Sequence, residues 1–331
     1  MRVLTGIKPS GSPHVGNLVG AIRPALGLAD QPGVEALFFV ADYHALTLVH
    51  DRAELGRLGR EVAATWVACG LDLAKVIFYR QSDVPELFEL AWVLACFTSK
   101  GWMNKAHAYK ARVAAAREAG AAEDEIDAGI DMGLYEYPVL MSADILALDS
   151  DVVPVGPDQL QHIEIARDIA ERVNHTYGDL LRVPAARVDQ VLVPGTDGRK
   201  MSKSYGNTLP LFGDPKELRK AVMRIVTDST PPEAAKDPDS ALVFQIHRHF
   251  LSAAEADALA ARYRAGIGWG DAKKLLADRL EEVLAEPRRR YAELMASPGE
   301  LDRLLADGAR RARAIATPVL ARVRQGIGIS G

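Results

Sequence analysis

Short apolar runs alternate with longer segments of helical periodicity over the first two thirds of the chain. In residues 35–41 every position after Glu35 is apolar, as in a parallel strand that is covered on both faces. The predicted strands are 2–4, 35–41, 76–79, 151–155 and 190–193, and the predicted helices are 18–30, 52–69, 85–98, 135–148 and 159–172. This alternation predicts an α/β fold with a Rossmann-like, doubly wound parallel sheet.

Two later regions depart from that pattern. Residues 104–128 are rich in Ala, Lys and Arg, and we expect them to form a mobile, solvated pair of helices. From Asp214 onward only helical periodicity remains, over 215–226 and 240–331, with a turn-rich connection at 228–239. We therefore expect a Rossmann-like domain over residues 1–205, followed by an all-helical C-terminal domain over 206–300.

Composition narrows the class of protein. The chain has 331 residues, of which 48% are apolar, and a net charge of −4, so a nucleic-acid partner would have to be bound by local basic patches. Cys69 and Cys96 lie in apolar contexts and are expected in the core, and so few cysteines indicate a reducing cytoplasm. We expect no signal peptide and no membrane span, because no apolar run reaches about 18 residues.

The stretch that organises the chain is 5–17, TGIKPSGSPHVGN, which connects the first strand to the first helix. Its glycines let the backbone approach a ligand closely, and the free N–H groups of a first helical turn attract anions. His14 and Asn17 can donate hydrogen bonds to phosphate oxygens, and the missing Cβ of Gly16 leaves room for an adenine ring. The alternative is a tight strand-to-helix connection without a ligand.

A second stretch favours a nucleotide. Residues 198–204, GRKMSKS, place Lys200 and Lys203 on a glycine-flanked loop. Two cations on a flexible loop suit a triphosphate, because negative charge grows on the leaving pyrophosphate. Solvated loop lysines are the alternative, but the two stretches together favour ATP.

The motifs HVGN and KMSKS resemble the two signatures of class I aminoacyl-tRNA synthetases. Residues 133–146, GLYEYPVLMSADIL, and 153–162, VPVGPDQLQH, resemble the bacterial tryptophanyl-tRNA synthetases, and the likeness covers essentially the whole chain. It implies activation of L-tryptophan with ATP and Mg²⁺, transfer to tRNA(Trp), and a cytoplasmic homodimer with no membrane partner. It also implies that 206–300 binds the tRNA anticodon and that a last helix, about 301–331, packs back on the catalytic domain.

The resemblance also assigns a nucleotide site. The ATP-binding candidates are Lys8, Pro9, Ser10, Gly16, Asn17, Gly156, Pro157, Asp158, Val191, Lys200, Met201, Ser202, Lys203 and Ser204. The catalytic candidates are His14, Asn17, Lys200, Lys203 and Arg112, with Lys110 as the alternative to Arg112. Lys8 departs from the glutamine of many relatives, and it would bind a phosphate or the tryptophan carboxylate.

Asp144 is the candidate selectivity residue. It lies in an otherwise apolar helix, where a buried carboxylate is costly unless it has a partner, and the resemblance implies that it accepts the indole N–H. The alternative is an Asp on the exposed side of that helix. The other tryptophan-binding candidates are Tyr137, Met141, Ile145, Val153 and Val155 as walls, His44 and Gln159 at the head group, and Leu4 (a Phe in relatives) with Gly6.

The implied reaction is attack of the tryptophan carboxylate on the α-phosphorus of ATP. This nucleophile is already ionised, so positioning and charge stabilisation are sufficient and no general base is needed. We predict no metal ligand from the protein, because the sequence has no carboxylate cluster dedicated to Mg²⁺, which ATP and water would hold. Late arginines, at 288–290 and 310–324, are candidates for tRNA phosphate contacts or for a solvated helix face.

Three other functions stay open on the sequence. A tyrosyl-tRNA synthetase has the same fold and also uses an Asp, but for a phenol. A paralogue that binds an amino acid or a nucleotide without acylation is opposed by the intact motifs. A small nucleotidyltransferase would not need so long a helical extension.

Overall fold

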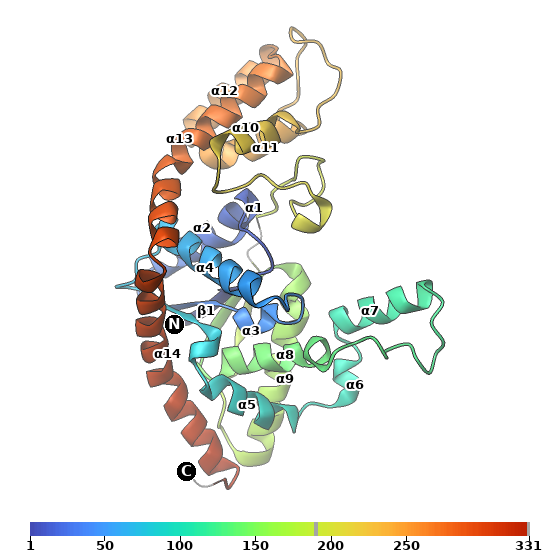
Figure 1. Cartoon of the computed structure of the whole chain (residues 1–331), viewed down its shortest axis with the longest axis vertical. Coiled ribbons are helices and arrows are strands. Elements are labelled where there is room, and N and C mark those ends of the chain that lie inside the picture. The colour runs from blue at the N-terminus through green and yellow to red at the C-terminus, as the bar shows by residue number, and fades with distance from the viewer. Residues whose placement is uncertain (189–190, 330–331) are drawn as a thin grey trace.

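Five parallel strands form the central sheet of the computed structural model, which describes residues 1–188 and 191–329 (Figure 1). The strands, in spatial order, are β3 (Ile77–Arg80), β2 (Glu35–Val40), β1 (Arg2–Ile7), β4 (Val152–Val155) and β5 (Ala185–Val188). The chain leaves β1 in one direction and later returns to its other side, so β1 and β4 flank the switch point at which such sheets bind ligands. The predicted Rossmann-like, doubly wound sheet is confirmed.

Both faces of the sheet are covered, because successive side chains of a strand point to opposite faces. Leu37 and Phe39 of β2 lie in one apolar core with Tyr79 of β3, whereas Phe38 and Phe78 lie in a second core. The helices that contribute to the first core include α5 (Glu86–Ala95), α8 (Met132–Leu146) and α9 (Leu160–Tyr177), and those of the second include α2 (Arg23–Ala29) and α4 (Arg52–Ala68).

Short helical turns follow the strands at the carboxyl edge of the sheet. The helix predicted over 18–30 starts earlier, as α1 (Val15–Asn17) and a π-helical turn η1 (Leu18–Ile22) that leads into α2. Three further turns come directly after β2, β3 and β4: α3 (Asp42–Ala45), η2 (Gln81–Asp83) and η3 (Pro157–Gln159). Polar residues that follow different strands are therefore held at the same edge.

The strand predicted over 190–193 is wrong for its described part. Gln190 lies outside the described residues, and 191–193 have no regular structure; the last strand of the sheet is β5. The run is apolar for another reason: Val193 is buried, and its carbonyl accepts the Met201 N–H at 2.9 Å. The segment thus packs against the lysine loop instead of extending the sheet.

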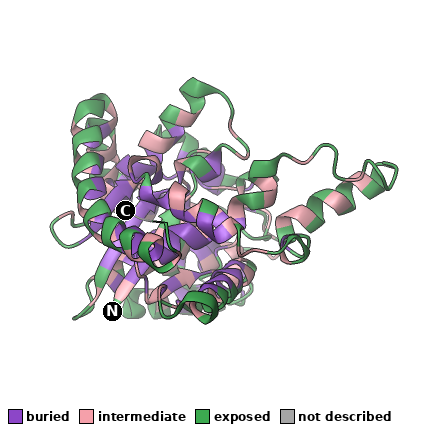
Figure 2. Cartoon of the chain, turned by 90° about the horizontal axis from the view of Figure 1, so that it is seen from below, coloured by how far each residue is buried: buried purple, intermediate pink, exposed green. Residues whose placement is uncertain are grey.

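The region 104–128 contains one helix rather than the predicted pair. α6 (Lys100–Met103) leads into α7 (His107–Glu118), and the residues after Glu118 form turns. None of the α7 residues is buried, and the arm that carries it projects from the body of the molecule (Figures 1 and 2). Cys96 is also not in the core as predicted: it is exposed, one turn after Trp92 on the outer side of α5.

Among the described residues 214–329, all regular secondary structure is helical, and loops connect the helices. They are α10 (Pro215–Met223), α11 (Leu242–His247), a 3-10 turn η5 (Arg248–Phe250), α12 (Ala253–Ala265), α13 (Trp269–Ala296) and α14 (Pro298–Gly326). No helix in the described part of the chain is both long and apolar enough to cross a membrane.

The last helix, α14, runs back along the edge of the sheet beside β3 (Figure 1). Gly308 allows this approach, because a Cβ there would lie 1.6 Å from the Phe78 carbonyl oxygen. Arg311 donates to the carbonyl oxygens of Leu73 (3.0 Å) and Val76 (3.2 Å), so this arginine is used in packing.

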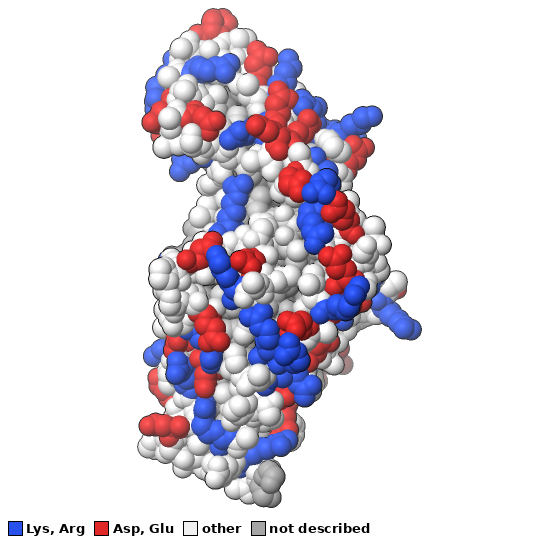
Figure 3. Space-filling model, turned by 90° about the vertical axis from the view of Figure 1, so that its left-hand side faces the viewer, with Lys and Arg blue, Asp and Glu red and all other residues white. Residues whose placement is uncertain are grey.

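Most of the late arginines have partners within the chain. Arg313 pairs with Glu86 of α5 (3.0 Å), Arg322 with Asp149 (2.7 Å), and Arg324 with Glu89. The face that these helices present carries basic and acidic side chains intermixed (Figure 3). Such pairs favour a role in docking α14 over a free basic patch for tRNA.

Candidate active site

The two motif loops, far apart in the sequence, meet in the structure. The Gly16 N–H donates to the sulfur of Met201, at 3.2 Å. A Cβ on Gly11 would lie 2.8 Å from Cδ and 3.0 Å from Nζ of Lys203, so this lysine crosses the glycine turn. Position 16 is also closely packed, since a Cβ there would approach the side chains of Met201 and His14 at 3.0–3.2 Å.

A buried asparagine that the sequence analysis missed holds the lysine loop. Asn207 is 2% exposed, and its Oδ1 accepts the Ser202 N–H (2.8 Å). Its Nδ2 donates to Asp197 Oδ1 (2.6 Å) and to the Lys200 carbonyl (3.1 Å). Backbone geometry in the loop therefore depends on one amide, while the lysine side chains stay outside this network. No motif in the sequence marks that role.

The lysine side chains of this loop are exposed and have no carboxylate within ion-pair distance among the described residues. Partial burial lowers the pKa of Lys203. Burial, and then the Lys203 charge, lower the pKa of His14 to about 4, so its ring is neutral at neutral pH. His14 Nδ1 is buried without a partner in the described structure, which leaves it available to a ligand.

Lys8 lies just beyond β1, at the switch point. Its Nζ is 3.5 Å from Thr47 Oγ1, and partial burial lowers its pKa. Ser10 is exposed and Pro9 is buried in the same turn. Thus a third cation lies at the sheet edge, beside the neutral Thr47 hydroxyl.

The remaining nucleotide candidates follow β4 or approach α2. Gly156 precedes the turn η3, which contains Pro157 and Asp158, and the exposed Asp158 accepts from Gln159 Nε2 (3.3 Å). The Val191 carbonyl lies 3.0 Å from the position of a Cβ on Gly20. Ser204 is exposed in the 3-10 turn η4 (Lys203–Tyr205). These groups lie near the first helix or at the carboxyl end of β4.

Arg112 and Lys110 are not brought to these loops. Both are exposed on α7, in the projecting arm (Figure 2). Their assignment to the triphosphate stays a prediction, and it requires the arm to move.

Asp144 is buried, 1% exposed, on the inner side of α8, so the alternative of a solvent-facing Asp is excluded. His44 Nε2 lies 2.9 Å from its Oδ2, and Gln81 Nε2 donates to Oδ1 (2.8 Å) and Oδ2 (3.0 Å). Burial raises the pKa of Asp144, while His44 and Gln81 oppose that rise. Each carboxylate oxygen has more than one lone pair, so a further donor can still be accepted.

Apolar groups surround this carboxylate. Leu4, Ile145, Val153 and Val155 lie in the same core as Phe39, whereas Met141 is only partly buried against it. The Phe39 ring covers Gly6, where a Cβ would be 2.5 Å from the ring.

Tyr137 lies beside this group together with His162, a histidine that the sequence analysis missed. The Tyr137 hydroxyl is 2.6 Å from His162 Nε2, and its ring makes an edge contact with His44 at 6.1 Å. Burial lowers the pKa of His162 to about 4. Gln159 is half-buried one turn before His162, at the start of α9.

Two of the missed residues, Gln81 and His162, were within reach of the sequence. Gln81 is the first residue after β3, and polar residues that follow a strand at its carboxyl end face the ligand crevice of such sheets, so its position in the sequence already marked it. His162 ends the VPVGPDQLQH segment on which the resemblance depends.

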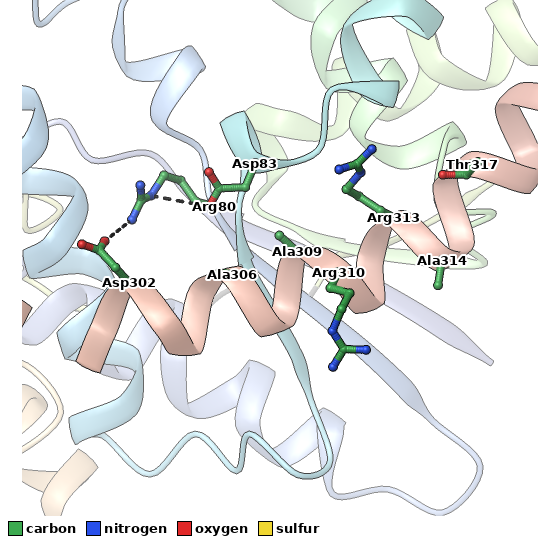
Figure 4. A pocket seen from close by; sticks show the side chains of 9 residues that line it. All are labelled: Arg80, Asp83, Asp302, Ala306, Ala309, Arg310, Arg313, Ala314 and Thr317. Carbon is green, nitrogen blue, oxygen red and sulfur yellow. Dashed lines mark hydrogen bonds and ion pairs between the residues drawn. The ribbon is translucent and has the colours of Figure 1, made fainter. Parts of the chain in front are cut away.

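A separate hollow of about 670 Å³ lies between η2 and α14 (Figure 4). Its charged groups have partners among themselves or nearby, since Arg80 pairs with Asp302 (2.6 Å) and Arg313 with Glu86. None of the candidate residues lines it.

Comparisons with known proteins identify the family of this chain. The family described as "tRNA synthetases class I (W and Y)" matches residues 1–285. The chain therefore belongs to the class I tRNA synthetases of this group. Within it, the chain is 48% identical to the tryptophan--tRNA ligase of Neisseria meningitidis over 99% of this chain and 98% of that one. It is 51% identical to the Xanthomonas axonopodis enzyme of the same name, over 99% and 76%.

Solved structures give the same result. The tryptophanyl-tRNA synthetase of Campylobacter jejuni, complexed with ADP and tryptophane, has a TM-score of 0.89 and 41% identity, covering 99% of this chain and 100% of that chain. A tyrosyl-tRNA synthetase from Aeropyrum pernix is 23% identical with a TM-score of 0.64, which shows the fold alone. The resemblance to bacterial tryptophan enzymes that the motifs indicated is confirmed.

Proposed function

We propose that this chain is a tryptophan–tRNA ligase, which converts L-tryptophan and ATP to tryptophanyl-adenylate and then charges tRNA(Trp). The observation that carries the proposal is the buried, partnered Asp144 at the same sheet edge as the two basic loops. An apolar pocket with one fixed acceptor suits indole, and a neighbouring pair of cationic loops suits a triphosphate.

The roles of the residues follow from the charges that each step must bind. Asp144 accepts the indole N–H, Tyr137 forms part of the wall of the tryptophan site, and His44 and Gln159 border the amino-acid head group. Lys8, His14 and Asn17 border the phosphates next to the attacked phosphorus. Lys200 and Lys203 meet the negative charge that develops on pyrophosphate.

Magnesium belongs to this proposal as part of the ATP substrate. Within the described ranges no three His, Cys, Asp or Glu residues come together as a metal site. The ion would be held by phosphate oxygens and water, as is usual for Mg²⁺. We propose a cytoplasmic location because the proposed substrate is tRNA.

An assay of ATP–pyrophosphate exchange with each of the twenty amino acids tests the proposal. Exchange with tryptophan alone, followed by charging of tRNA(Trp), is the expected result. Exchange with tyrosine would assign the chain to the other branch of the family, and binding without exchange would indicate a paralogue that does not acylate.

For tRNA, we propose that residues 1–205 with α14 form the catalytic domain and that 206–300 read the anticodon. The apolar core supports only part of this division, because residues of α10, α11 and α13 join the second core beneath the sheet. Two measurements test the division. Transcripts of tRNA(Trp) with altered anticodons should be charged less well by the wild-type protein. Substitutions in 206–300 should change the charging of tRNA but not pyrophosphate exchange.

We also propose a homodimer. The outer side of α5 carries Phe88, Trp92 and Cys96 at helical spacing, and Trp92 is 74% exposed. The Tyr43 ring packs on Phe88 at 4.4 Å and is itself 43% exposed, which widens the apolar surface. Such a surface marks an interface.

Sedimentation at micromolar concentration should give twice the chain mass of 35.8 kDa. Trp92→Glu should give a single chain. A wild-type protein that sediments only as one chain would reject the dimer.

A further inference from the structure

One buried side chain of the candidate site has no role in the motifs or in the proposed reaction. Gln81 is the first residue of η2, directly after β3, and is 0% exposed. Burial of an amide is costly unless its donors and acceptor find partners. Those partners lie within the site itself.

The Gln81 amide joins α3, η2 and α8. Its Nε2 donates to Asp144, at 2.8 Å from Oδ1 and 3.0 Å from Oδ2, and its Oε1 accepts the His44 backbone N–H at 3.4 Å. The backbone donor fixes the orientation of the amide, because only its oxygen can accept from an N–H. Asp144 therefore meets a donor from Gln81.

The turn that carries Gln81 is also held on both sides. Ser82 donates to Asp42 of α3 through its backbone N–H (3.1 Å) and through its hydroxyl. Arg80 pairs with Asp302 of α14 at 2.6 Å. Hence the position of the Gln81 amide is set by neighbouring elements and does not depend on a bound ligand.

We propose that Gln81 is a positioning residue that keeps the Asp144 carboxylate directed at the indole N–H, and thereby sets the selectivity for tryptophan. The inference rests on the proposed role of Asp144 as the indole acceptor. A neutral amide suits this task, because it supplies a donor to the carboxylate without neutralising its charge.

The groups that face Asp144 give this role a pH signature. Burial and the Asp42 carboxylate raise the pKa of Asp144, whereas His44 and Gln81 lower it. Tyr79, buried behind the carboxylate, has a pKa raised by burial and by Asp144. Removing the Gln81 donor therefore raises the pKa of Asp144 further, and the ionised acceptor is lost at a higher pH.

Gln81→Met keeps the length of the side chain and removes the donor. The readout is kcat/KM in pyrophosphate exchange for tryptophan and for its benzothiophene isostere, which lacks the N–H, from acidic to neutral pH. For tryptophan, Gln81→Met should lower kcat/KM roughly tenfold to a hundredfold, the range for one hydrogen bond to a charged group. The isostere should change little, and the preference for tryptophan should fall at a higher pH than in the wild type.

Two further variants separate positioning from packing. Gln81→Glu has the same shape but brings a second carboxylate to Asp144, so its loss of selectivity should be larger. Gln245→Met is the matched control, since Gln245 is half-buried in α11 and donates only to the Asp239 carbonyl. If Gln81→Met does not fold, as judged by thermal unfolding, Gln81→Glu and the shorter amide of Gln81→Asn carry the test.

An equal loss for tryptophan and isostere, with an unshifted pH profile, would overturn the inference and leave Gln81 a packing residue. Asp144→Ala, measured alongside, distinguishes a failure of the proposed role of Gln81 from a failure of the proposed role of Asp144. If Asp144→Ala abolishes selectivity but no Gln81 variant changes it, only the inference about Gln81 fails. If Asp144→Ala also retains selectivity, the proposed role of Asp144 fails.

Discussion

The residues around Asp144 and the loop that carries Lys200 and Lys203 hold their charged side chains in opposite environments. Asp144 is 1% exposed and already has donors from His44 and Gln81, whereas the two lysines are exposed without an ion-pair partner among the described residues. A ligand-reading group must be rigid to discriminate, while a cation that meets developing charge has to remain free until that charge appears. The same sheet edge thus combines a preformed region with an adjustable one.

The two regions also differ in how much their charged groups cost in folding free energy. Burying Asp144 has a desolvation cost that hydrogen bonds must offset, so losing one partner there affects folding as well as selectivity. The lysine side chains of the loop are exposed, and Asn207 bonds to the loop backbone at Lys200 and Ser202. We therefore expect variants of the pocket to lose stability and affinity, and variants of the loop to lose rate.

The largest expected effect is that of Asp144→Ala. It should lower kcat/KM for tryptophan by roughly 2–4 kcal/mol, the range for losing a hydrogen bond to a buried charged group with its partners left unpaired. Selection against the benzothiophene isostere should disappear, as measured by pyrophosphate exchange. Asp144→Asn, which keeps the shape, is the control for cavity effects. Retained discrimination in both variants would place the selectivity at another residue.

Lys203→Ala should act on rate and leave the pocket intact. The loss is expected to be about 2–4 kcal/mol in the pre-steady-state rate of adenylate formation, by analogy with the loss of one preorganised donor. Tryptophan affinity and the unfolding midpoint should not change. Lys220→Ala, an exposed lysine of α10 beside Glu217, is the matched control. A variant that forms adenylate at the wild-type rate at saturating ATP would remove Lys203 from the mechanism.

Asn207→Ala tests whether loop geometry alone matters. It removes a 2%-exposed amide that orders the loop around Lys200, without removing either cation. We expect a rate loss of about 1–3 kcal/mol, because a buried donor or acceptor is left unpaired and the loop is loosened. Equilibrium dialysis should give unchanged tryptophan binding without ATP; weaker binding there would mean that the two regions are coupled.

The smallest effect concerns the free energy of unfolding at acidic pH, to which three buried histidines contribute. The pKa of His14, His162 and His247 is lowered to about 4 in the folded chain, mainly by burial, against 6.5 when unfolded. The unfolded chain then binds more protons between these values, so the stability they contribute is present above pH 6.5 and is lost as pH falls toward 4. His247→Gln should remove about 1–2 kcal/mol of the loss between about pH 7 and pH 5 in urea unfolding. An identical pH dependence in this variant would exclude His247.

The sequence by itself determined the α/β alternation and the two motif loops, and it marked Asp144 as a candidate, because each depends on residues that are close together in the chain. Periodicity placed β1 to β4 within a few residues, and the glycines of 5–17 and the lysines of 198–204 carry their chemistry locally. The sequence analysis misplaced β5 and Cys96. An apolar run alone does not show whether its side chains pack on a sheet, pack on a loop or lie at the surface.

Only the tertiary structure decided which groups meet. The Gln81–Asp144 hydrogen bonds span 63 residues, the Gly16–Met201 contact spans 185, and Arg311 reaches Leu73 across 238. Neither Gln81 nor Asn207 belongs to a motif, and their importance comes from burial together with their hydrogen bonds: Asp144 lies 63 residues from Gln81, and the partners of Asn207 lie 5 to 10 residues away. Burial and partner choice are properties of the whole packed chain, so no local pattern contains them.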